Sequence, residues 1–95
     1  MAVNFAELIA DTRETCSERA QDVELGSEEW KAYSAIVTII DHSSGDLETR
    51  AGFIARSLTV LTHTSNHGAM EREILNVYTD AFNSVAGKPL ARMIR

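Results

Sequence analysis

The chain has 95 residues, a hydrophobic content of 44%, a charged content of 24% and a formal net charge of −5 at pH 7. This length supports one hydrophobic core and excludes a second, so we expect a single helical domain, 1–95. Apolar residues spread along the whole chain argue against intrinsic disorder, and the acidic balance makes nucleic acid an unlikely partner.

The charge is divided unevenly between the two halves of the chain. Residues 1–49 contain eleven acidic and three basic side chains, a net charge of −8, whereas residues 50–95 contain three acidic and six basic ones, a net charge of +3. Such an asymmetry indicates surfaces that suit oppositely charged partners.

The N-terminal residues lack the basic start and the uninterrupted apolar stretch of a secretory signal. No apolar run approaches the roughly 20 residues of a membrane span. The chain has one cysteine, Cys16, which excludes an intrachain disulfide. We therefore expect a cytoplasmic protein that does not contact a membrane.

A first helix is predicted to begin after Asn4, a favourable N-cap residue, with Glu7 positioned to complete a capping box. Gly26 is predicted to end this segment. Its apolar side recurs at helical spacing: Phe5, Ile9, Thr12, Cys16, Ala20 and Val23. Because Cys16 lies on that side and is flanked by acidic residues, we interpret it as a buried core residue and not as a nucleophile.

Ser27 is predicted to cap a second helix that ends near His42, with two glutamates in its first turn. Residues 34–40 are rich in β-branched side chains and are also compatible with a buried strand. We favour a helix, since the chain has no second segment with which a strand would pair.

Asp46 is predicted to cap a third helix, followed by a turn at residues 63–68 in which Ser65 or Asn66 caps the next helix. The third helix has a seven-residue apolar seam: Leu47, Ala51, Ile54, Leu58 and Leu61. The fourth has a similar seam: Met70, Ile74, Val77, Ala81 and Val85. This spacing is typical of packed helix bundles.

Gly87 is predicted to end the fourth helix, and Leu90, Met93 and Ile94 suit a short C-terminal helix after Pro89. The short breaks between helices favour antiparallel neighbours. The expected fold is therefore all-α, a four-helix up-and-down bundle-like domain with a short C-terminal helix.

The third and fourth helices also have apolar residues beside their main seams. Such a second stripe indicates either a wide core inside one chain or a contact surface for a second chain, and composition does not separate the two. Aromatic side chains among them are suitable interface anchors. The predicted partner-interface residues are Trp30, Phe53, Val60, Leu75, Tyr78 and Phe82.

The first helix carries an acidic stripe opposite its apolar side: Glu7, Asp11, Glu14, Glu18 and Asp22. Its simplest interpretation is a solvated outer face. The alternative is a surface for a basic partner, and the basic, partly apolar C-terminal segment, residues 88–95, is one candidate to dock on it.

The histidines allow a hypothesis of metal binding. His63, His67 and Glu71 are four residues apart and would share one helix face, with Asp41 and His42 as further candidates. The turn residues between His63 and His67 disrupt this register, so we favour a polar turn and expect no metal and no cofactor. A further alternative, nucleic-acid binding, would use Arg50, Arg56, Arg72, Lys88, Arg92 and Arg95.

The sequence thus predicts a non-catalytic, helical protein-interaction module, such as a regulator, inhibitor or assembly factor, that forms a homodimer. The alternative is a metal- or ligand-binding bundle that uses His63 and His67. No phosphate-binding loop, nucleophile elbow or paired cysteine motif is present in the sequence.

Overall fold

The computed structural model describes the backbone of residues 4–64 and 68–86, and the side chains of residues 4–63 and 72–86. Within these residues the chain forms four α-helices and no strand. The helices are α1 (Phe5–Gln21), α2 (Glu28–His42), α3 (Leu47–Thr64) and α4 (Gly68–Ala86). The predicted all-α class is confirmed, and residues 34–40 are helical. The predicted C-terminal helix at Leu90, Met93 and Ile94 lies outside the described residues.

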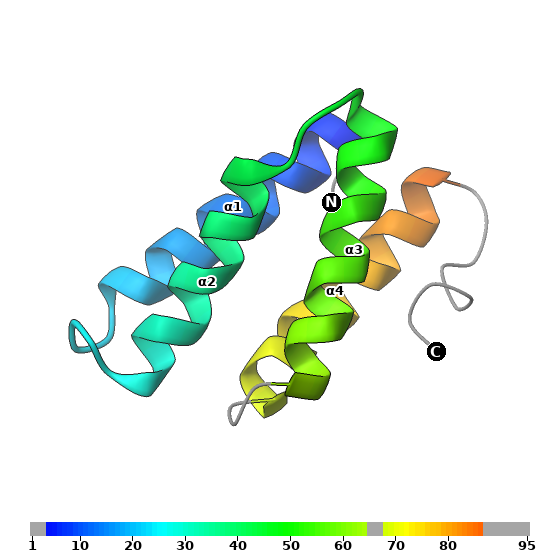
Figure 1. Cartoon of the computed structure of the whole chain (residues 1–95). Helices are drawn as coiled ribbons and strands as arrows, with labels where there is room; N and C mark the ends of the chain where they lie inside the picture. Colours follow the sequence, from blue (N-terminus) through cyan, green and yellow to red (C-terminus); the bar gives the residue numbers. More distant parts are fainter. Residues whose placement is uncertain (1–3, 65–67, 87–95) are drawn as a thin grey trace.

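The helices run alternately up and down and pair as two antiparallel hairpins, α1 with α2 and α3 with α4 (Figure 1). Each helix of the second hairpin also packs against both helices of the first, and the principal extents of the molecule are 37 × 24 × 23 Å. Among the described helices, none combines the length and the apolar content that a membrane crossing requires.

Side-chain caps begin the first three helices where the sequence predicts them. The side chains of Asn4, Ser27 and Asp46 each accept a hydrogen bond from the backbone N–H three residues on, at 2.9, 3.2 and 2.8 Å. Each bond satisfies a donor that the first turn of a helix leaves without a partner. The N–H of Thr49 also holds the pKa of the Asp46 carboxyl below its ordinary value.

Helix α1 ends at Gln21, earlier than the predicted stop at Gly26. The N–H of Asp22 is shared between the carbonyls of Glu18 and Arg19, both at 3.2 Å, which tightens the last turn. Gly26 instead lies in the turn before α2, where its φ of +83° suits a residue without a side chain. Val23 is therefore a turn residue and not part of the helix.

The core lies where the two hairpins meet. Cys16 of α1, Ile36 of α2 and Ile54 and Leu58 of α3 are fully buried. The predicted core position of Cys16 is confirmed, and burial raises the pKa of its thiol to about 11. The α3 seam is confirmed except at Leu47, which begins the helix and is 44% exposed.

The predicted seam of α4 is wrong at Val77, which is 65% exposed. The stripe formed by Leu75, Tyr78 and Phe82 is buried in the core instead. Of the two alternatives for this stripe, the structure therefore has the wide core, and these three predicted interface residues are not exposed. Contacts within the chain explain why this stripe, and not the one that contains Val77, faces the core. The Tyr78 hydroxyl donates to the carbonyl of Ala51 at 2.7 Å, and the Phe82 ring contacts Phe5 with centroids 5.3 Å apart.

Candidate interaction site

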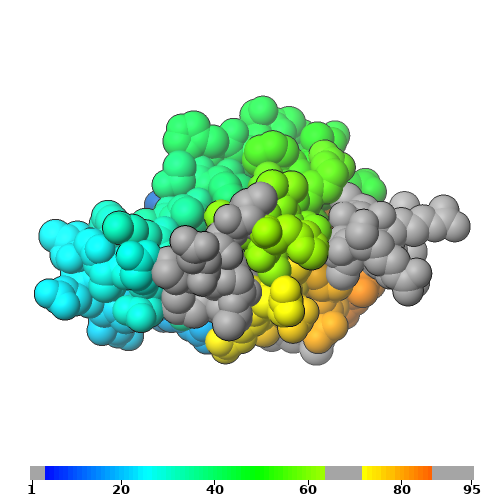
Figure 2. Space-filling model, turned by 60° about the horizontal axis from the view of Figure 1, so that its bottom comes forward, coloured from blue at the N-terminus to red at the C-terminus, as the bar shows by residue number. Residues whose placement is uncertain are grey.

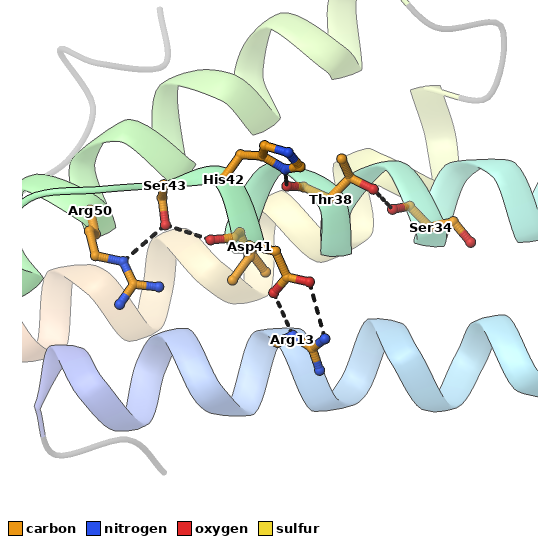
Figure 3. Close-up of polar contacts among 8 residues, drawn as sticks. Arg13, Ser34, Thr38, Asp41, His42, Ser43 and Arg50 are labelled. Carbon is orange, nitrogen blue, oxygen red and sulfur yellow. Dashed lines mark hydrogen bonds and ion pairs between the residues drawn. The ribbon is translucent and has the colours of Figure 1, made fainter.

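Polar contacts join α1 to α2 near the end of the first hairpin (Figure 3). The Arg13 guanidinium donates two hydrogen bonds to the Asp41 carboxylate, at 2.7 and 3.1 Å. Nearby, the Ser43 hydroxyl donates to the carbonyl of Ile40 and accepts from Nε of Arg50. Asp41 and Arg50 are therefore both engaged in contacts within the chain.

These contacts bear on the hypothesis of a metal site. Asp41 is paired with Arg13, and Nδ1 of His42 lies 2.8 Å from the carbonyl of Thr38 in its own helix. His63 is exposed in the last turn of α3. His67 and the side chain of Glu71 lie outside the described residues. Among the described side chains, no three metal-ligating groups gather at one place.

The ion pair between Arg13 and Asp41 gives a testable prediction about the pKa of Asp41. Its hydrogen bonds hold the pKa of Asp41 below the ordinary 3.8, so the carboxylate stabilises the fold above that pH, and the effect is lost as the pH falls through the lowered pKa. Arg13→Ala is expected to return the pKa of Asp41 toward 3.8, as measured by carbon NMR of the side-chain carboxyl. Lys31→Ala is the control. It also removes a basic side chain, but Lys31 pairs with Glu28 and not with Asp41, so the pKa of Asp41 is expected to stay unchanged. An unchanged Asp41 pKa in Arg13→Ala would contradict the assignment.

The exposed apolar side chains of α3 form a surface beside α2. Phe53 and Val60 are 40% and 60% exposed. They border a shallow hollow of about 420 Å³ together with the partly buried Ile39 and Leu61, and Arg56 and Ser57 complete its lining. We call Phe53, Val60, Ile39 and Leu61 the α3 patch. Sequence reasoning missed Leu61 because it belongs to the α3 seam, and it missed Ile39 because the position of α2 beside α3 depends on helix packing.

Trp30, the remaining predicted anchor, is partly buried near the turn between α1 and α2. This turn forms one end of the molecule (Figure 2). Trp30 lines a second hollow with Val23, Val37 and Leu25, and Leu25 is 79% exposed. The lining residues of the two hollows have no member in common, so Trp30 does not border the hollow of the α3 patch.

A further apolar surface lies between α1 and α4. Leu8 and Thr12 of α1 and Ile74, Val77 and Tyr78 of α4 line a groove of about 380 Å³. We call it the α1/α4 groove. The sequence alone could not predict it, because the groove depends on how two helices from different hairpins cross.

The acidic stripe of α1 is exposed along its whole length, as predicted. Asp11, one of its members, also lines the α1/α4 groove, so the stripe borders that groove on the α1 side. Asp80 lines it on the α4 side. The groove therefore has an apolar floor between two acidic edges.

Arg19 is the basic side chain among the described residues that line this groove. Its guanidinium lies 3.5 Å from the carboxylate of Glu73 and 5.8 Å from the centroid of the Tyr33 ring. The hydrogen bond with Tyr33 raises the pKa of Arg19. The positive charge of Arg19 is therefore engaged by Glu73 and Tyr33. The side chains of Asp11 and Asp80 keep the two edges of the groove acidic.

The predicted basic residues do not form one surface in the part of the chain that the structure describes. Arg50 contacts Ser43, Arg56 borders the α3 patch, and Arg72 is exposed on α4. Lys88, Arg92 and Arg95 lie outside the described residues. The chain matches no family model, no curated protein and no solved structure.

Proposed function

We propose that this chain is a non-catalytic helical interaction module that assembles as a homodimer in the cytoplasm. The observation that supports the proposal is the α3 patch, where Phe53 and Val60 present apolar surface to solvent in a chain whose core is already filled by Tyr78 and Phe82. Apolar side chains gathered around a hollow are typical of protein-interaction surfaces.

The spacing of the α3 patch suits a second copy of the chain. Phe53 and Val60 are seven residues apart, so they lie about 10.5 Å apart along one side of α3. When two α3 helices pack antiparallel about a two-fold axis, each Phe53 faces the Val60 of the other copy. The hollow beside Ile39 then receives apolar side chains from the opposite protomer.

The positive charge of Arg56 next to the α3 patch weakens the pairing of two copies. Arg56 is exposed between Phe53 and Val60, so the two-fold axis brings two guanidinium groups near each other. The α3 patch offers four apolar side chains per copy, so we expect a small interface, and interfaces below about 1,200 Å² are typical of weak complexes. We expect a dissociation constant in the micromolar range or weaker.

Sedimentation velocity over a concentration series tests the homodimer. Wild-type chain is expected to associate as its concentration rises, whereas Phe53→Asp stays monomeric because it places a carboxylate in the apolar contact. Leu25→Asp, which changes an exposed leucine in the turn after α1, is the control and keeps the wild-type behaviour. A wild-type chain that remains monomeric at millimolar concentration would overturn the homodimer.

Arg56→Ser separates a homodimer from a complex with an acidic partner. In the homodimer this change removes a like-charge contact, so association tightens by about twofold, and added salt tightens the wild-type pairing in the same direction. A partner that places a carboxylate opposite Arg56 predicts the reverse, namely weaker binding in Arg56→Ser and at high salt.

A further inference from the structure

We infer that the α1/α4 groove is a docking site for a basic amphipathic helix of another protein. This groove shares no lining residue with the α3 patch, so the inference goes beyond the homodimer. An experiment can therefore contradict either proposal without contradicting the other.

The floor of the groove is suited to apolar side chains. Ile74 and Tyr78 are buried beneath it, and Val77 between them is 65% exposed. The Thr12 hydroxyl donates to the carbonyl of Leu8 at 2.8 Å, so its polarity is satisfied within α1. A volume of about 380 Å³ accepts side chains of the occupant, since protein ligand pockets span roughly 300–1,000 Å³.

The length of the groove sets the spacing of the occupant's anchors. From Ile74 to Ser84 the α4 wall extends about 15 Å, which is nearly three helical turns. A helix lying along this wall therefore inserts apolar residues at positions i, i+3 or i+4, and i+7. This is the pattern by which amphipathic helices bind apolar grooves.

The edges of the groove select the charge of the occupant. Asp11 on α1 and Asp80 on α4 are exposed and line opposite sides. Behind Asp11 the acidic stripe continues along α1. Because Arg19 is occupied by Glu73 and Tyr33, cationic side chains on both flanks of a docked helix meet carboxylates.

The test uses the full chain and a peptide of about 14 leucine and lysine residues, long enough for four turns of an amphipathic helix. A matched peptide replaces every lysine by glutamate. Fluorescence anisotropy is expected to show micromolar binding of the lysine peptide and no binding of the glutamate peptide. Lysine-peptide binding is expected to weaken with added salt.

Two variants of the chain locate the binding. Val77→Asp changes an exposed position, so it is compatible with folding, and it is expected to weaken the lysine peptide at least tenfold by charging the floor. The double variant Asp11→Lys with Asp80→Lys is expected to weaken it roughly tenfold, because it reverses both edges. Leu25→Asp is the matched apolar-to-acid control and leaves binding unchanged. Circular dichroism verifies that each variant keeps its helices.

Four results would overturn the inference. If both peptides bind equally, the acidic edges do not select the occupant. If wild type and Val77→Asp bind the lysine peptide equally, the peptide does not bind in the groove. Binding that appears only when Leu90 and Met93 are replaced by Asp assigns the groove to residues 88–95 of the chain itself. Loss of self-association in Val77→Asp assigns it to a second copy. Failure of the Phe53→Asp experiment leaves the three peptide-binding results unchanged, because that experiment concerns the α3 patch and these results do not require the chain to self-associate.

Discussion

Replacement of Leu58 by alanine is expected to lower the free energy of unfolding by about 2–5 kcal/mol. Leu58 is fully buried in the middle of α3, among Ile54, Ala55 and residues of the other helices. Removing its side chain forfeits the transfer free energy of the buried groups and leaves a cavity that the packed helices close only in part. A domain of this size has a total stability of about 5–15 kcal/mol, so the loss is a large share.

Chemical denaturation at neutral pH measures this loss, and Leu47→Ala is the matched control. It makes the same chemical change in the same helix at a position that is 44% exposed, and it is expected to cost less than about 1 kcal/mol. Equal losses in the two variants would show that α3 does not pack into the core as described.

Tyr78→Phe is expected to destabilise the chain by about 1–2 kcal/mol at pH 7, the second large effect. The Tyr78 side chain is 1% exposed, and its hydroxyl donates to the carbonyl of Ala51, which ties α4 to α3. Phenylalanine keeps the ring and its packing against Phe82 but removes the donor. The carbonyl of Ala51 then loses a partner in a buried setting.

The same variant has a characteristic pH dependence. Burial raises the pKa of Tyr78 above its ordinary value of 10.0, so the folded state keeps the hydroxyl proton while the unfolded state loses it as the pH exceeds 10. The stability that the hydroxyl provides is therefore complete below pH 10 and declines above it. At pH 11 the difference between wild type and Tyr78→Phe is expected to narrow by about 1.4 kcal/mol. Denaturation curves at both pH values measure this, and a constant difference would contradict the buried hydroxyl.

The sequence predicted the starts of α1, α2 and α3 correctly because a cap depends on a few adjacent residues. The caps predicted for the fourth helix, Ser65 or Asn66, lie outside the described residues. Asn4, Ser27 and Asp46 each bond to a backbone group three residues away. The end of α1 was predicted too late, because Gly26 marks the turn and not the last helical hydrogen bond. Local signals thus locate an element better than they locate its last residue.

Two further features depended on tertiary packing and were beyond the reach of periodicity. On α4 both adjoining stripes are apolar, and the core face is decided by partners far away in the sequence, Ala51 for Tyr78 and Phe5 for Phe82. The ion pair of Arg13 with Asp41 likewise joins residues in different helices. The exposed face of α3 at Phe53 was predicted as one of two alternatives, and its role as a contact surface stays a prediction.

The pairing of neighbouring helices also shapes how the chain acquires its structure. Because α1 packs mainly on α2 and α3 mainly on α4, most contacts join segments that are close in the sequence. Chains with such local topology fold in microseconds to milliseconds, since little loop entropy is lost before contacts form. The ring contact between Phe5 and Phe82 joins the first helix to the last, so it closes only when both hairpins have met. Folding of this chain is therefore expected to be fast within each hairpin and to finish with the docking of the two.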